Sequence, residues 1–271
     1  MTVECRHTEV WSGGGIRVES RSCDYGSERW TDRLEGGAFG VLLPIAGAYR
    51  LRTDGVKQFV DQSCGTFRRP GEEVIGSGIS RAHTSTALYV DVDRFDAVDG
   101  GDWPSGELFV DPRLDFRHRL LRRELRAGLD SDGVEMRAVE VLAGTLAMDG
   151  PPARRPLGIA ARHRQITAEV LEALDQANGS FSLIELAKAV GCSPFHLSRI
   201  FHHTTGVTLR QHRAGVRLRA ALDLLEQGMR DLTSIAATCG FADHSHLTRT
   251  ATAQLGTCPS RLRELLREPS P

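Results

Sequence analysis

Two stretches about fifty residues apart share one pattern, and this repeat constrains the fold more than any other feature. They are "GCSPFHLSRIFHHTTG" at 191–206 and "GFADHSHLTRTATAQLG" at 240–256. Each contains a turn glycine, a residue that caps a helix, an apolar anchor, an arginine and a final glycine. The offset is 49 residues before the turn and 50 after it, so the second turn holds one extra residue. The pattern predicts two copies of one helical module in a single chain.

Each copy has the capping and terminating residues expected of a helix-turn-helix. Ser193 suits the N-cap of a helix, Pro194 suits its first position, and Gly206 suits its end. In the second copy Asp243 takes the capping role and Gly256 the terminating role. The preceding short helices have matching apolar faces, which are Leu183, Leu186, Ala187 and Val190 in the first copy and Leu232, Ile235, Ala236 and Cys239 in the second.

Between the copies, residues 209–228 form an amphipathic pattern that predicts a long connecting helix. In a helix-turn-helix the first helix supports the second, whose exposed face enters the major groove of DNA. A rigid connector would hold the two modules about 34 Å apart, one turn of DNA, on successive major-groove segments. The predicted partner is double-stranded DNA in an operator or promoter.

The exposed faces of the two second helices supply the candidate DNA-binding residues. Arg199 and Arg249 match across the repeat, and arginine pairs with guanine through two parallel hydrogen bonds. A solvated helix face is the alternative for any one polar residue. The candidates are Phe195, His196, Ser198, Arg199 and His202 in the first helix, and His244, Ser245, His246, Thr248 and Arg249 in the second. Four further arginines lie near the start of the connector, namely Arg210, Arg213, Arg217 and Arg219. They cannot all point the same way, so only some of them are expected to contact phosphate.

The first half has a different period and predicts an α+β chain. Short β-rich runs from about 15 to 95, separated by Gly, Pro and Asp turns, favour an antiparallel β-barrel or jelly roll. Such a shell can enclose one small ligand. Two helices follow, and either belongs to the domain's own packing or forms the seam of a homodimer. The Pro- and Gly-rich stretch 149–158 predicts a linker between a domain at 1–148 and an all-α domain at 159–271.

Charge and cysteine usage agree with a DNA-binding second half. Residues 153–271 carry 15 Lys+Arg against 10 Asp+Glu, whereas the chain as a whole has a net charge of −1. The six cysteines are scattered without a CxxC pair, which suits reduced thiols in a cytoplasmic protein. Cys5, His7, Cys23 and Cys64 are the one conceivable set of soft-metal ligands, and incidental cysteines are the favoured reading. We expect no cofactor, no metal, no signal peptide and no membrane span.

Residues 160–267 resemble the C-terminal DNA-binding domain of the AraC/XylS family of bacterial transcription regulators. The resemblance rests on "LAKAVGCSPFHLSRIFHHTTGVT" and "IAATCGFADHSHLTRTATAQLGTCPSRLR". It implies a cupin-like N-terminal domain that binds a small effector or dimerises, with RNA polymerase as a further partner of an activator. It also implies base reading at Phe195, His196, Ser198 and Arg199.

The chain departs from the family at several positions. Leu247 and Ala251 stand where the second module usually has phenylalanine, Leu209 where proline is usual, and His212 where an aromatic is usual. Ala251 matters most, because neighbours must fill the volume of a missing buried aromatic.

Three alternatives compete with a transcription regulator. They are a cupin-like enzyme, a metal or thiol sensor with an appended DNA-binding domain, and a repair protein with a metal-held reactive cysteine. The sequence contains no nucleophile elbow, Walker loop, HExxH motif or paired carboxylates, so we expect no catalytic residue. A fragment beginning near Arg155 is expected to fold and bind DNA unaided.

Overall fold

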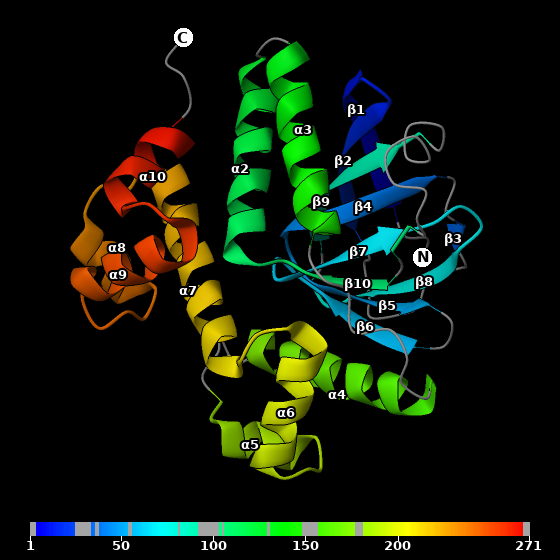
Figure 1. Cartoon of the computed structure of the whole chain (residues 1–271), viewed down its shortest axis with the longest axis vertical. Helices are drawn as coiled ribbons and strands as arrows, with labels where there is room; N and C mark the ends of the chain where they lie inside the picture. Colours follow the sequence, from blue (N-terminus) through cyan, green and yellow to red (C-terminus); the bar gives the residue numbers. More distant parts are fainter. Residues whose placement is uncertain are drawn as a thin grey trace. The chain divides into compact units, whose positions relative to one another are not determined.

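The computed structural model describes residues 4–24, 34–35, 38–53, 56–80, 82–91, 103–104, 106–128, 131–147, 157–176 and 181–267. Strands come first along the chain and helices follow, which confirms the predicted α+β class (Figure 1). The strands are β1 (Glu4–Gly13), β2 (Ile16–Asp24), β3 (Leu34–Glu35), β4 (Phe39–Ala46), β5 (Tyr49–Thr53), β6 (Val56–Val60), β7 (Cys64–Arg68), β8 (Glu73–Gly78), β9 (Ala82–Val90) and β10 (Gly106–Phe109). The helices are α2 (Pro112–Ala127), α3 (Ser131–Leu146), α4 (Leu157–Gln176), α5 (Leu183–Ala189), α6 (Pro194–Thr205), α7 (Leu209–Glu226), α8 (Leu232–Thr238), α9 (His244–Leu255) and α10 (Pro259–Leu266).

The described strands form two antiparallel sheets. One has the order β1-β2-β9-β4-β7-β10 and the other the order β3-β8-β5-β6. The ring of Tyr49 on β5 stacks on the ring of His83 on β9, with centroids 4.3 Å apart. Because these two strands belong to different sheets, both rings lie between the sheets. The predicted antiparallel domain is thereby confirmed.

Contacts divide the chain into two compact units. One comprises residues 1–109 with 145–209 and is called the sheet unit below; the other comprises 110–144 with 210–271 and is called the connector unit. The first helix-turn-helix module belongs to the sheet unit and the second to the connector unit. The predicted linker at 149–158 lies outside the described residues, except for its last two residues, which begin α4.

In the sheet unit, α4 joins the first module to the four-stranded sheet. Phe59 of β6 belongs to the same buried cluster as Leu171 of α4 and Phe201 of α6. Arg50 of β5 holds the carboxylate of Glu172 on α4 with two nitrogens, and its Nε donates to Oε2 over 3.0 Å. A fragment that begins near Arg155 would lose this side of the first module's core.

In the connector unit, α2 completes the core of the second module. Leu120 of α2 belongs to the cluster that contains Leu222, Leu247 and Ala251. Two arginines of α2 also bind main-chain carbonyls at the ends of other helices. Arg113 Nε donates to Gln254 O over 3.0 Å, and Arg123 Nε donates to Arg267 O over 2.7 Å. Leu120 of α2 is therefore part of the internal packing of this unit.

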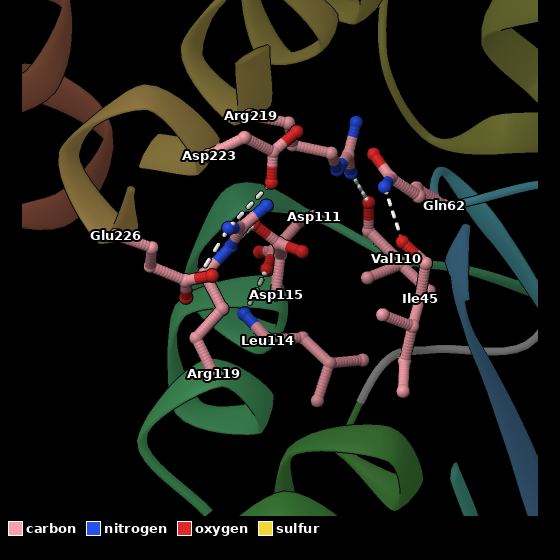
Figure 2. A network of polar contacts seen from close by, with 10 residues as sticks. All are labelled: Ile45, Gln62, Val110, Asp111, Leu114, Asp115, Arg119, Arg219, Asp223 and Glu226. Atoms are coloured by element: carbon pink, nitrogen blue, oxygen red, sulfur yellow. Dashed lines mark hydrogen bonds and ion pairs between the residues drawn. The ribbon is translucent and has the colours of Figure 1, made fainter. Parts of the chain in front are cut away.

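A buried arginine fastens α2 to the connecting helix α7. Figure 2 shows Arg119 between Asp115 on its own helix and Asp223 and Glu226 on α7, at N···O distances of 2.9, 2.7 and 3.3 Å. Only 2 % of the Arg119 side chain is exposed. Nearby, Arg219 of α7 donates to the carbonyl of Val110. These contacts make α2 and α7 a single packed pair.

Two cysteines depart from the expectation of reduced thiols. Cys5 and Cys23 form a disulfide, because the β1–β2 register sets them directly opposite each other with Cα atoms 4.1 Å apart. Cys64, Cys192, Cys239 and Cys258 are free thiols. The expectation is therefore wrong for the first pair, and these two sulfurs cannot serve as thiolate ligands while the disulfide stands.

Candidate nucleic-acid interface

The two turns have the same backbone geometry. Gly191 and Gly240 lie in the left-handed region with φ of 67° and 72°, where a side chain would be strained. One residue later, Cys192 N–H donates to Ala187 O over 3.0 Å, and Phe241 N–H donates to Ala236 O over 2.9 Å. The two turns that repeat in the sequence therefore also share the same backbone hydrogen bond.

The recognition helices α6 and α9 begin and end as predicted. Ser193 Oγ accepts from His196 N–H over 3.2 Å, and Asp243 Oδ1 accepts from His246 N–H over 2.6 Å. Gly206 and Gly256 terminate the helices with φ of 76° and 74°.

On α6 all five predicted DNA-binding residues face solvent. Leu197 and Phe201 anchor the helix and are fully buried. On the other face, 73 % of Phe195 is exposed. The guanidinium carbon of Arg199 lies 5.8 Å from the centre of the Phe195 ring. This contact restricts the conformations of the exposed Arg199 side chain.

On α9 the five predicted residues divide into two groups. His244 and Arg249 are exposed, whereas Ser245, His246 and Thr248 are half-buried. The ring of His246 packs edge-on against Phe241 with centroids 5.4 Å apart, and its Nδ1 lies 3.4 Å from Ala242 N. Thr248 Oγ1 donates to His244 O over 2.9 Å. His244 and Arg249 are the residues of α9 with the freest access to DNA.

The turn residue Phe241 and the small Ala251 both pack in the second core. Phe241 is buried in the cluster that contains Leu247 and Ala251. From α2, Phe116 and Leu120 pack against the same cluster. The helix α2 therefore supplies apolar volume to a module that has alanine where an aromatic is usual.

The caps give the two recognition helices different electrostatics. Backbone N–H groups, first that of His246, hold the pKa of the Asp243 carboxyl below its usual range, so α9 begins with a negative charge. The helix α6 begins with the neutral Ser193. A phosphate near the start of α9 is repelled by this carboxylate, and one near the start of α6 is not.

The part of the chain that the structure describes gathers no group of three or more His, Cys, Asp or Glu side chains suited to a metal ion. Nor does it contain a helix both long and apolar enough to cross a bilayer. Two residues that sequence reasoning did not single out lie at the first module, namely Arg162 and His163 of α4. The ring of His163 is 6.2 Å from that of His196.

Comparison with protein families gives a direct match to this region. Residues 186–265 match the family model described as "Helix-turn-helix domain". The segment contains both turns, both recognition helices and the connecting helix α7.

Curated relatives match over the same part of the chain. The Transcriptional activator RhrA of Rhizobium meliloti is 35 % identical over 91 residues, which is 33 % of this chain and 29 % of the relative. The HTH-type transcriptional regulator Rv1931c of Mycobacterium tuberculosis is 29 % identical over 89 residues, covering 33 % and 34 %. The HTH-type transcriptional activator RhaR of Escherichia coli is 31 % identical over 85 residues, covering 31 % and 30 %. The matches span about a third of the relatives' length, and all three are regulators of transcription by name.

Solved structures give weaker likenesses. ToxT from Vibrio cholerae, in a crystal structure with (E)-4-(8-methylnaphthalen-1-yl)but-3-enoic acid, matches 93 % of this chain and 100 % of that chain at 10 % identity and a TM-score of 0.36. A regulator with an AraC-type DNA-binding domain from Chromobacterium violaceum matches 42 % and 100 % at 22 % identity and a TM-score of 0.36. TM-scores this low support no inference about the chain.

Proposed function

We propose that the chain is a sequence-specific DNA-binding regulator of transcription and that residues 186–265, which match the helix-turn-helix family model, are its DNA-binding domain. Each module sets one recognition helix into the major groove of an operator or promoter. The two recognition helices read successive groove segments about 34 Å apart.

One observation carries the proposal. The same turn, cap and anchor recur in α5–α6 and α8–α9, and each copy exposes an arginine at the matching position, Arg199 and Arg249. A purely structural helical pair has no need of two matched, exposed arginines beside repeated helix-turn-helix turns. Both arginines suit guanine, and Phe195 suits the methyl group of thymine. The other proposed contacts to bases or phosphates are His196, Ser198, His202, His244, Ser245, His246 and Thr248.

We further propose that the space between the sheets holds a small effector with a polar group. His83 and Ser85 lie on the same face of β9, because side chains two residues apart on a strand share a face. Burial lowers the pKa of His83 to about 4, so its imidazole is neutral at physiological pH. The Ser85 hydroxyl is buried and has no hydrogen-bond partner among the described residues, and such groups ordinarily have one. An effector that supplies this partner would also meet the Tyr49 ring.

The strand β5 could transmit a structural change from this space to the first module. Tyr49 faces His83 between the sheets, and the next residue, Arg50, holds Glu172 on α4. The helix α4 in turn shares its core with α6. An effector acts only through a difference in its affinity for two arrangements, and a shift of β5 changes the support of α4 directly.

We propose a homodimer formed through α3. Its outward stripe is apolar and has the 3–4 spacing of paired helices: Met136, Val139, Ala143 and Leu146. Met136 is 54 % exposed and Val139 42 % exposed, whereas Leu120 and Leu121 of the stripe on α2 are buried. A second copy of the same stripe would cover it with twofold symmetry.

The remaining parts of the proposal follow from the regulatory role. A bacterial regulator of this type acts in the cytoplasm, where its DNA lies, and needs no catalytic residue. The relatives named as activators favour RNA polymerase as a further partner.

Selection of bound duplexes from a pool with a randomised 30-bp segment tests the proposal. The full-length chain should enrich a two-part site whose halves lie one helical turn apart. Enrichment of no sequence above the starting pool would contradict it. An Arg199→Ala variant should bind the selected site about 1–3 kcal/mol more weakly, with discrimination relaxed at one base pair.

A further inference from the structure

The helix before each helix-turn-helix also approaches its turn. Arg162 of α4 lies near Cys192 in the first turn: burial raises the pKa of the Cys192 thiol, and the charge of Arg162 partly opposes this rise. The ring of His163 on α4 packs edge-on against the ring of His196 in the first turn of α6. The N-terminal part of α4 therefore lies beside the start of the first recognition helix.

The connecting helix α7 likewise places an arginine beside the second turn. The Nε atom of Arg217 lies 3.6 Å from the position that a Cβ atom on Gly240 would occupy. Gly240 is the turn glycine that corresponds to Gly191 in the first module. An arginine from the preceding helix thus stands beside the turn in both modules.

Burial along α4 and α7 supports a repeat of three helices. Buried positions of α4 recur in α7 at an offset of 51 residues, as the sets Thr167, Val170, Leu171, Leu174 and Leu218, Ala221, Leu222, Leu225 show. Each of these helices packs on the helix-turn-helix that follows it in the chain. Each module is therefore three helices, α4–α5–α6 and α7–α8–α9.

Arg162 and Arg217 are exposed, and neither forms an ion pair within the described ranges. Their neighbours are engaged in the fold. The charge of Arg164 partly opposes the rise that burial causes in the pKa of Glu107, and Arg219 is buried and donates to Val110 O. The two exposed arginines are the cations that α4 and α7 leave available at the turns.

We propose that Arg162 and Arg217 bind backbone phosphates on either flank of the grooves that α6 and α9 enter, so that each module contacts DNA with three helices. This inference rests on the proposed DNA-binding function. When a recognition helix enters the groove by its N-terminal end, groups beside that end meet the phosphates of the groove edge. A guanidinium matches phosphate geometry with paired hydrogen bonds.

The test is the salt dependence of DNA binding by the full-length protein. Affinities of Arg162→Gln, Arg217→Gln and the double variant are measured by fluorescence anisotropy from 50 to 300 mM salt. Two duplexes are used, a site selected from the randomised pool and a shuffled sequence of the same composition. Each single variant should reduce the slope of log K against log salt by about 0.9, and the double variant by about 1.8. Affinity should fall by the same factor on both duplexes, because phosphates carry no sequence information.

Two matched controls remove an exposed arginine from each unit away from the turns. Arg17→Gln on β2 breaks a partly exposed ion pair with Glu19, and Arg261→Gln on α10 breaks an exposed ion pair with Glu264. Both should leave the slope unchanged. Arg162→Lys and Arg217→Lys keep the charge and should restore the wild-type slope, which excludes loss of folding as the cause.

The outcomes separate this inference from the proposed function. If the wild type binds with salt-dependent affinity and both Gln variants keep its slope, the contacts by α4 and α7 are wrong and DNA binding stands. A loss confined to the selected duplex would make the arginines base readers and would also overturn the phosphate assignment. If the wild type binds neither duplex, the inference and the proposed function fall together.

Discussion

Substitution of Arg119 by methionine tests whether α2 is part of the second module. The Arg119 side chain is 2 % exposed and is surrounded by Asp115, Asp223 and Glu226. Breaking a buried ion pair by removing one partner costs roughly 3–5 kcal/mol, because the other charge stays buried. The Asp115 carboxylate is only 8 % exposed and would stay buried without a partner, whereas Asp223 is 37 % exposed and can be solvated. We therefore expect a loss of about 3 kcal/mol, at the low end of that range.

Hydrogen exchange measured by mass spectrometry assigns this loss to a place in the fold. In Arg119→Met at pH 7, amides of α7 and α9 should exchange faster by roughly two orders of magnitude, as 1.4 kcal/mol is a factor of ten. Amides of α6 belong to the sheet unit and should keep their protection. The control is Arg261→Met, whose pair with Glu264 is 60 % exposed on both sides and is worth at most about 1 kcal/mol.

A second variant distinguishes the loss of packing from the effect of leaving the Asp115 carboxylate buried without a partner. Adding Asp115→Leu to Arg119→Met removes the trapped carboxylate and should recover much of the protection, since apolar replacements of buried ion pairs are often neutral. If Arg119→Met exchanges within a factor of five of the wild type, or if α6 loses protection together with α9, the reasoning is refuted.

Three further results are expected. Val139→Glu on α3 should turn a dimer into a monomer in analytical ultracentrifugation, and a wild type that is already monomeric at micromolar concentration would exclude this seam. Burial raises the pKa of Glu107 to about 8 despite Arg164, so the neutral carboxyl is favoured in the fold and the native state weakens as pH rises. The stabilising effect of Glu107→Gln should thus be absent below about pH 4.5 and grow toward pH 8 by at most about 1.4 kcal/mol per pH unit, and a difference that does not change with pH would count against burial. A fragment 110–271, which keeps α2, should protect the amides of α9 better than a fragment 155–271, and equal protection would show that α2 is dispensable.

The local structure of the modules could be predicted because it depends on neighbours in the sequence. A serine or aspartate cap, a proline at the first helical position and a glycine in the left-handed region act within one helical turn. These signals placed the starts of α6 and α9 at Pro194 and His244, and their ends at Gly206 and Gly256.

What the sequence could not reveal depends on partners far along the chain. Nothing near Leu120 indicates that it belongs to the same buried cluster as Ala251, because this cluster depends on how α2 meets α9. The Cys5–Cys23 disulfide likewise depends on the register of β1 and β2, which no CxxC spacing signals. The packing of the His246 ring against Phe241 is likewise visible only in the fold. The roles of individual DNA-binding residues remain predictions.

Methylation interference on a selected duplex tests the central claim, that two matched modules read one DNA site. Guanines methylated at N7 should block wild-type binding in two clusters about 10 bp apart. Arg199→Ala should abolish the interference in one cluster only, and Arg249→Ala in the other only. A single cluster, or two clusters that neither substitution changes, would contradict the account.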